Sequence, residues 1–153
     1  MVDGKEIAEF AGLWAIKEDR TQPRVLEWTT SPASDILEAE HFGYNPIVHR
    51  RRVELTKATS SVLITDHVRG TGKHLVESFL HFAPHVRLEQ KGSQTILATG
   101  TFGSYRFEVS SGKLEIQDTW FSKSYGVRER NKMLYISWQQ ELPLETTIRI
   151  EHA

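Results

Sequence analysis

Short runs of alternating apolar and polar residues recur along this chain, and they constrain its fold more than any other feature of the sequence. Val62, Ile64 and Val68 recur at even spacing, and a period of two is typical of a strand with one buried face. Glycine and serine interrupt such runs roughly every 8–12 residues, as in β-sandwiches and barrels. No stretch keeps the 3.6-residue period of an amphipathic helix. The pattern predicts an all-β, antiparallel, multi-stranded β-sandwich of two packed sheets with about eleven strands.

Length and composition predict one ordinary globular domain over residues 1–153. A chain of 153 residues is long enough to bury roughly 70% of the surface that it exposes when unfolded. Its residues are 39% hydrophobic and 25% charged, close to the average of globular proteins. The net charge of −1 gives no overall attraction for a polyanion, so we expect no nucleic acid partner.

The absence of two sequence features reduces the number of possible function classes further. It contains no cysteine, which excludes disulfides, thiolate nucleophiles and cysteine-based metal sites. No apolar run approaches the ~20 residues of a membrane span, and the N-terminus lacks the charged and apolar regions of an export signal. We therefore expect a soluble chain with no membrane partner.

Residues 36–55 are the strongest candidate for contact with a ligand. Two strand-like runs meet at residues 43–46, a turn-forming cluster whose Gly43 can take a positive φ and whose Pro46 breaks a hydrogen-bond ladder. The stretch also gathers polar and aromatic side chains that an ordinary hairpin does not need: His41, Tyr44, His49, Arg50, Arg51 and Arg52. A few polar groups placed together are typical of ligand sites.

The three consecutive arginines point to two faces of one strand. Because side chains alternate, Arg51 shares a face with His49 and the apolar Ile47, whereas the two neighbouring arginines lie on the opposite face. A guanidinium binds a carboxylate or sulfate through two parallel hydrogen bonds, so an anion site is one interpretation. The other is ion pairing with carboxylates of neighbouring strands, namely Glu38, Glu40 or Glu54. The sequence leaves both open.

Seven histidines raise the question of a metal site. His67 and His74 flank the glycine-rich residues 70–73 and would face one another across a tight hairpin turn. Asp66 is a conceivable third ligand, but neighbouring strand residues point to opposite faces, so Asp66 and His67 do not easily converge. A structural zinc site needs four ligands and a catalytic site three. We therefore predict no metal ligands and no cofactor.

Other catalytic patterns are weak. Residues 70–73 lack the spacing of a P-loop, so we interpret them as a hairpin turn. No Gly-x-Ser-x-Gly elbow is present, and Asp35, Glu38 and Glu40 are too closely strung along one strand for the separated acids of a glycosidase. Four tryptophans form either a sugar-stacking platform or parts of the core; they are Trp14, Trp28, Trp120 and Trp138. We assign no catalytic residue.

Local patterns at the two ends of the chain complete the strand prediction. Apolar residues around Gly12 predict one or two short strands, with a helix over residues 5–10 as the alternative; they are Ile7, Phe10, Leu13, Trp14 and Ile16. Near the other end, strand-like runs at residues 114–121 and 133–140 flank residues 122–131, which we expect to form a loop.

Six segments of the sequence carry a family resemblance. They are VDGKEIAEFAGLWA, ILEAEHFGY, HRRRVEL, ITDHVRGTGKHLVESFLHFAP, SKSYGV and ELP, and they extend over nearly the whole chain. In this order they resemble the carboxy-terminal β-domain of heparinase II/III-like polysaccharide lyases. The most specific pieces are the His-Phe-Gly-Tyr turn, the His-Arg-Arg-Arg strand and the Leu-His-Phe-Ala-Pro strand end, none of which is a catalytic motif.

The resemblance implies an architecture and a reaction. Such lyases join an N-terminal helical toroid to a C-terminal, supersandwich-like β-domain and cut acidic polysaccharides, such as glycosaminoglycan or alginate, in the cleft between them. The reaction is β-elimination, in which the uronate carboxylate is neutralised, a Tyr or His removes the C5 proton and the 4-linked sugar leaves. The family's usual setting is periplasmic or secreted.

The chain departs from this family by being short. The toroid is missing, and so is the early β-domain segment with the family's His/Asp metal site and His-Asn pair. No catalytic base or metal ligand is therefore carried over. We expect a C-terminal fragment of a larger lyase, inactive by itself, whose partners are an anionic polysaccharide and the toroid of its parent chain. The expected substrate contacts are His41, Tyr44, His49 and Arg51.

Two alternatives from other functional classes remain open. A stand-alone carbohydrate-binding module predicts saccharide affinity and an exposed row of tryptophans. A structural β-domain that braces a helical catalytic domain predicts no glycan affinity and an exposed apolar patch where that domain docks.

Overall fold

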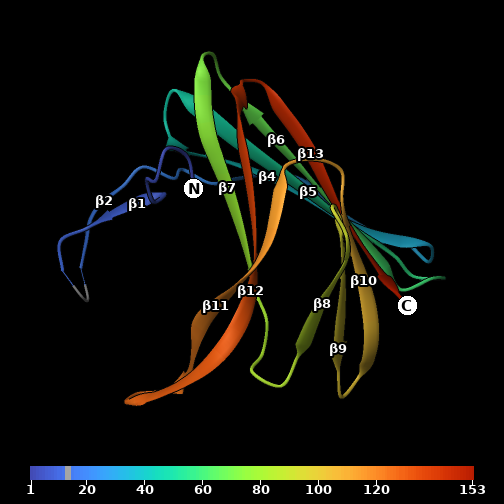
Figure 1. Ribbon diagram of the computed structural model, residues 1–153. Coiled ribbons are helices and arrows are strands. Elements are labelled where there is room, and N and C mark those ends of the chain that lie inside the picture. Colours follow the sequence, from blue (N-terminus) through green and yellow to red (C-terminus); the bar gives the residue numbers. More distant parts are fainter. Residues whose placement is uncertain (13–14) are drawn as a thin grey trace.

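The computed structural model describes residues 1–12 and 15–153, and these residues form thirteen strands and no helix (Figure 1). The strands are β1 Ala8–Phe10, β2 Ile16–Asp19, β3 Arg24–Thr30, β4 Ser34–Tyr44, β5 Ile47–Thr56, β6 Ser61–Arg69, β7 Lys73–His81, β8 Arg87–Gly92, β9 Thr95–Gly100, β10 Gly103–Val109, β11 Lys113–Ser124, β12 Val127–Glu141 and β13 Leu144–His152. The strand pairs are antiparallel. The all-β, antiparallel prediction is confirmed, with thirteen strands in place of about eleven.

The described residues contain no helix that is long and apolar enough to cross a membrane. Short strands were predicted on both sides of Gly12, and β1 and β2 are found there. Leu13 and Trp14, which belong to that prediction, lie outside the described residues.

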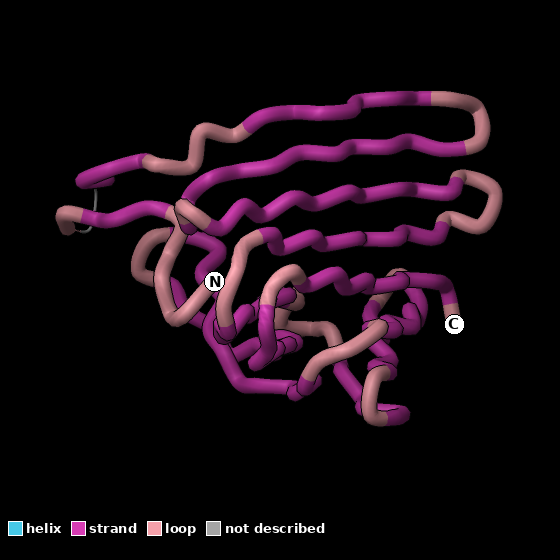
Figure 2. Tube along the Cα trace, turned by 90° about the horizontal axis from the view of Figure 1, so that it is seen from above, coloured by secondary structure: helices cyan, strands magenta, loops and turns pink. Residues whose placement is uncertain are grey.

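The strands form a large sheet, a small sheet and a separate hairpin. The large sheet has eight strands in the order β3-β4-β5-β6-β13-β10-β9-β8, and the small sheet has three in the order β11-β12-β7. The remaining two, β1 and β2, pair with each other. Figure 2 shows long strands running side by side above the other elements. The arrangement is sandwich-like, as predicted, but the two sheets are very unequal in size.

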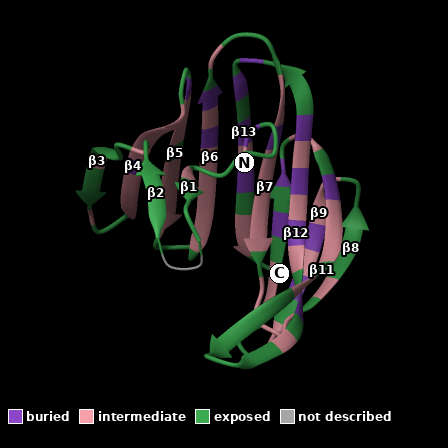
Figure 3. Ribbon diagram, turned by 90° about the vertical axis from the view of Figure 1, so that its left-hand side faces the viewer, coloured by how far each residue is buried: buried purple, intermediate pink, exposed green. Residues whose placement is uncertain are grey.

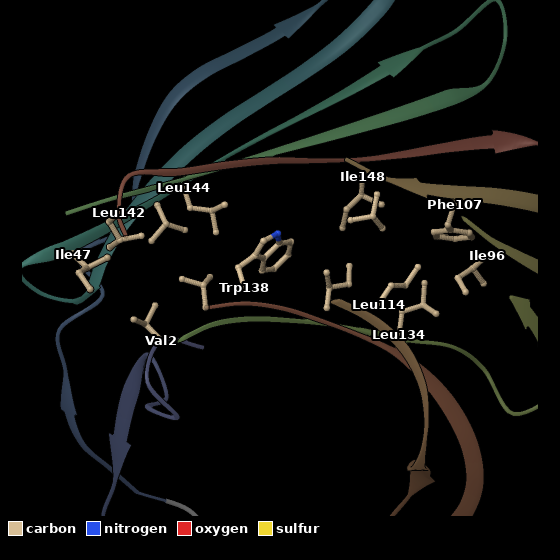
Figure 4. Packing of buried hydrophobic residues seen from close by; sticks show 14 of the residues in the cluster. Val2, Ile47, Ile96, Phe107, Leu114, Leu134, Trp138, Leu142, Leu144 and Ile148 are labelled. Carbon is tan, nitrogen blue, oxygen red and sulfur yellow. The ribbon is translucent and has the colours of Figure 1, made fainter. Parts of the chain in front are cut away.

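The core lies between the small sheet and the part of the large sheet around β13, β10 and β9. In Figure 4, Leu144 and Ile148 lie along one layer and face Leu134 and Trp138 of the other. Burial of each such aliphatic side chain contributes about 1.5–3 kcal/mol. Trp138 is 5% exposed, and its Nε1 donates a hydrogen bond to Ser111 Oγ at 3.0 Å. Trp138 is therefore a core residue and takes no part in a sugar-stacking platform.

The glycine-rich segment between β6 and β7 is not a hairpin turn, and the interpretation of residues 70–73 was wrong. β6 belongs to the large sheet and β7 to the small one, so the chain crosses between sheets here. The Gly72 oxygen accepts a hydrogen bond from Leu142 N at 2.9 Å. A Cβ on Gly70 would lie 3.0 Å from the side chains of Ile47 and Leu142. Glycine at this position allows the crossing segment to pack closely against the core.

Residues 36–55 form the hairpin β4–β5 inside the large sheet, as predicted. Its pairing shifts register between His41 and Tyr44, which is the mark of a β-bulge. Gly43 does not use the positive φ that is open to glycine. A Cβ on Gly43 would instead lie 2.8 Å from the backbone oxygen of Ile7. The glycine is needed because the N-terminal segment passes directly against the end of β4.

The strands β11 and β12 form a long hairpin arm that extends away from the rest of the molecule (Figure 1). We predicted a loop at residues 122–131, but β11 continues to Ser124 and β12 begins at Val127. Figure 3 shows that the end of this arm is exposed, and Tyr125 at its tip is 97% exposed. The end of the arm has no buried apolar face and lacks apolar alternation, so the sequence pattern does not reveal the strands there.

Candidate functional site

The four residues expected to contact substrate lie around one cavity of about 240 Å³. His41 and Tyr44 come from β4, and His49 and Arg51 from β5. The register of the large sheet sets His41 opposite His49 and Arg51 opposite Asp66 of β6. All five side chains line the cavity, which is completed by apolar residues: Val68, Val76, Phe79, Trp138 and Leu144.

Asp66 holds the polar side of the cavity together. Its Oδ1 accepts hydrogen bonds from His49 Nε2 and Arg51 Nε, both at 2.7 Å, and its Oδ2 accepts one from Arg51 Nη2 at 2.8 Å. The residue is 5% exposed. Burial by itself raises the pKa of Asp66, but the hydrogen bonds from His49 and Arg51 lower it to about 2. The carboxylate is therefore ionised at neutral pH and fixes both of its partners.

A series of side-chain contacts leads from Asp66 through His49 to His41. His41 Nε2 lies 3.0 Å from His49 Nδ1, and the Gly43 backbone N–H donates to His41 Nδ1 at 3.3 Å. Since Nδ1 of His41 accepts, its Nε2 carries the proton and donates to His49, whose own Nε2–H donates to Asp66. Burial, followed by the nearby His49 and Arg51, lowers the pKa of His41. Both ring nitrogens of a neutral His41 are thus engaged within the protein.

Tyr44 closes the cavity beside His41, with ring centroids 5.4 Å apart and planes inclined at 59°. Burial, and secondarily the charge of Glu6, raises the pKa of Tyr44 to about 12. The phenol is therefore neutral at physiological pH. Among the described residues its hydroxyl has no hydrogen-bond partner, so it is available as a donor to a ligand.

A second, larger cavity of about 590 Å³ adjoins the first and shares Val2, Ile7 and Tyr44 with it. Carboxylates outnumber basic side chains in its lining: Asp3, Glu6, Glu9 and Glu18 against Lys5 and Arg20, with His74 beside them. Such a lining repels an anionic group and accepts hydrogen bonds from hydroxyl groups.

The arginine triplet divides as alternation predicted, and its two faces have different roles. On the outer face Arg50 Nε bonds Glu38 at 2.7 Å and Arg52 Nη1 bonds Glu27 at 2.6 Å, so ion pairing accounts for both. On the inner face Arg51 uses Nε and Nη2 for Asp66. Its Nη1 has no partner in the described part of the chain and is the donor left for an anion.

The histidines considered for a metal site do not converge. His67 lies 3.3 Å from Glu145 and His74 lies 2.7 Å from Asp3, on strands of different sheets. No group of three potential ligands is found within residues 1–12 and 15–153. Asp66, which we considered only as a metal ligand, is instead the partner of His49 and Arg51.

Asp66 is the site residue that the sequence reasoning missed. Its place opposite Arg51 follows from the register of the β5–β6 hairpin, in which Thr56 pairs with Ser61 on either side of a short turn. The short stretch of residues 57–60 between the two strands was the available signal, because turn length sets hairpin register.

The tryptophans do not form the platform considered for sugar stacking. Trp28 is on the edge strand β3 and is 74% exposed, whereas Trp120 is on β11 in the other sheet. Trp138 is buried, and Trp14 lies outside the described residues.

Comparison with known proteins gives one family and several similar structures. The model of the family described as "Heparinase II/III-like, C-terminal" matches residues 1–149. No curated protein matches the chain. A heparinase III, the BT4657 gene product, is 16% identical with a TM-score of 0.72, and the match covers 88% of this chain and 22% of that one.

Two further structures are similar. Heparan sulfate lyase HepC from Pedobacter heparinus is 13% identical with a TM-score of 0.74, and the match covers 88% of this chain and 22% of the lyase. Another heparinase III is 11% identical with a TM-score of 0.66, over 84% of this chain and 20% of that one. The chain thus spans about a fifth of the length of these proteins, and at such identities the likeness concerns the fold.

Proposed function

Because the chain belongs to the heparinase II/III-like family, as its C-terminal domain, we propose that it forms one wall of a binding site for an anionic, uronic-acid-containing polysaccharide in a lyase. The observation that supports this most is the convergence of His41, Tyr44, His49 and Arg51 on one cavity. In this proposal the lyase cleaves by β-elimination, and its N-terminal helical domain forms the opposite wall.

The geometry favours a role in binding for these side chains. Arg51 Nη1 is oriented by the two bonds that the same guanidinium makes to Asp66, and it can bind the uronate carboxylate or a sulfate. The neutral Tyr44 hydroxyl can donate to a ring or glycosidic oxygen. Both interactions place a sugar unit, and neutralisation of the carboxylate makes the C5 proton more acidic.

The same geometry gives the cavity no ready base for the C5 proton. Both nitrogens of His41 are engaged, and the pKa of Tyr44 is raised to about 12. A general base needs a pKa near the working pH and a free acceptor atom. In our proposal the base therefore comes from the rest of the lyase, and the 153-residue chain is inactive alone.

The proposal is tested by titrating the chain with tetrasaccharides of heparan sulfate and of alginate in a calorimeter. Tyr44→Phe removes one hydroxyl and keeps the ring, so we expect it to weaken binding about fivefold, the value of one hydrogen bond. The matched control is Tyr105→Phe, whose ring contacts His152 on β13 away from the cavity. Equal affinities for wild type and both variants would refute the proposal.

A second candidate function is the bracing of another domain, and one observation favours it. Trp28 pairs with Leu37, which pairs with Val53, on the same face of the large sheet as Arg51. Trp28 is 74% and Val25 65% exposed. Apolar groups gathered in one exposed patch mark a surface that another domain or protein covers. A helical domain of the parent lyase is the proposed partner. The two functions are compatible, because a binding cleft formed between two domains also requires that the two domains be held together.

A further inference from the structure

A further groove, of about 310 Å³, lies between β8 and the β11–β12 arm. Its walls include His85 and Arg87 on one side and Asp118, Arg130 and Lys132 on the other. It shares no lining residue with the cavity around Arg51. Figure 1 shows its elements at the end of the small sheet where the arm projects.

The groove is basic in a chain whose net charge is −1. Arg87, Arg130 and Lys132 face a single carboxylate, Asp118, which already pairs with Lys132 at 2.7 Å. Within the described residues neither Arg87 nor Arg130 forms a salt bridge. Most arginines of the large sheet, by contrast, are paired with a carboxylate. The two free guanidinium groups are thus available to an external anion.

Trp120 holds the arginines of the arm in place. The guanidinium carbon of Arg128 lies 3.7 Å and that of Arg130 lies 3.9 Å from the centroid of its ring. A guanidinium over an indole face is attracted by the ring and keeps its N–H edge free for a carboxylate or sulfate. The stack therefore orders Arg130 before a ligand binds, which reduces the entropy lost on binding.

Asn131 adds an uncharged group to the same groove. It is 5% exposed, and its Nδ2 donates to the Phe82 oxygen at 2.6 Å. Its Oδ1 is buried without a hydrogen-bond partner among the described residues. Buried polar atoms are usually paired, but this oxygen exposes almost no surface, so the charged contacts of the groove come from its arginines.

We propose that this groove is a second site for an anionic saccharide, in which Arg87 and Arg130 bind a carboxylate or sulfate. The ligand class is taken from the proposed function, but the site is separate. A polymer bound here is held by the β-domain at a distance from the cavity around Arg51. The arm then acts as an anchor for the glycan chain.

The test uses the indole N–H signal of Trp120 in the 153-residue chain, identified by its loss in Trp120→Phe. We expect a heparin-derived tetrasaccharide to shift this signal and maltotetraose, which is uncharged, to leave it in place. Arg87→Gln and Arg130→Gln should each raise the dissociation constant at this signal about fivefold through the loss of a charged contact. The matched control is Arg24→Gln, since Arg24 also lies over an aromatic ring, 4.8 Å from the centroid of Phe42.

An unmoved indole signal would overturn the proposal. So would an equal effect of Arg24→Gln, which would mean that the tetrasaccharide binds the chain through general attraction only. Tyr44→Phe distinguishes the two sites: it should leave the Trp120 titration unchanged, and a loss of binding there would contradict a separate groove.

Discussion

Asp66 determines the chemistry of the cavity because it is a buried charge with several partners. Removing a carboxylate from water is costly, and the cost is offset only when hydrogen bonds satisfy it. Here His49 and Arg51 supply those bonds. The sequence allowed Arg51 and His49 to be placed on one face by alternation. It did not identify Asp66, because a partner on another strand depends on register and not on spacing.

Asp66→Asn should lower the free energy of unfolding by about 3 kcal/mol, since it leaves Arg51 without its counter-charge in a half-buried position. Urea unfolding at neutral pH measures this loss. The matched control is Asp118→Asn in the exposed pair with Lys132, for which we expect less than about 1 kcal/mol.

The same variant should change the dependence of stability on pH. The pKa of Asp66 is lowered from 3.8 to about 2 on folding, so its contribution, roughly 2 kcal/mol, is present above the unfolded value and is lost as the pH falls toward the folded one. Wild type should therefore lose stability relative to Asp66→Asn between pH 4 and pH 2. Parallel curves for the two proteins would contradict the ion-pair account.

Strand positions follow from the sequence more easily than the sheets to which the strands belong. The hairpin at residues 36–55 was predicted because both of its strands carry alternating residues beside a turn. The connection at Gly70 and Gly72 was misassigned because glycine-rich segments occur both in hairpin turns within one sheet and in crossings between two sheets. The end of the β11–β12 arm was missed because it buries no face.

Gly43→Ala tests why glycine occupies the end of β4. A Cβ there would lie 2.8 Å from the backbone oxygen of Ile7, so the N-terminal segment must move, at a cost of about 1–3 kcal/mol. We expect a lower melting temperature and faster amide exchange near Ile7. The control is Gly100→Ala, where the nearest atom, in Val86, is at an ordinary 3.5 Å. Equal melting temperatures for the two variants would show that the close approach is unimportant.

The molecule as a whole separates its packed core from the surfaces that we propose for binding. The small sheet covers only part of the large one, so much of β3 to β5 extends beyond the core and presents His41, Arg51 and Trp28 on an inner face. The all-β class and the four clustered residues were predictable, because both depend on local alternation. The unequal sheets were not, since the pairing of distant strands decides which half of a sheet is covered.

An NMR titration of the 153-residue chain with a heparan sulfate tetrasaccharide, combined with ultraviolet detection of unsaturated uronate in the same sample, tests whether this β-domain binds glycan without cleaving it. We predict that the signals of His41, Tyr44, His49 and Arg51 shift to saturation while no unsaturated product forms. Unchanged signals at these four residues, or release of unsaturated uronate by the chain alone, would contradict the account.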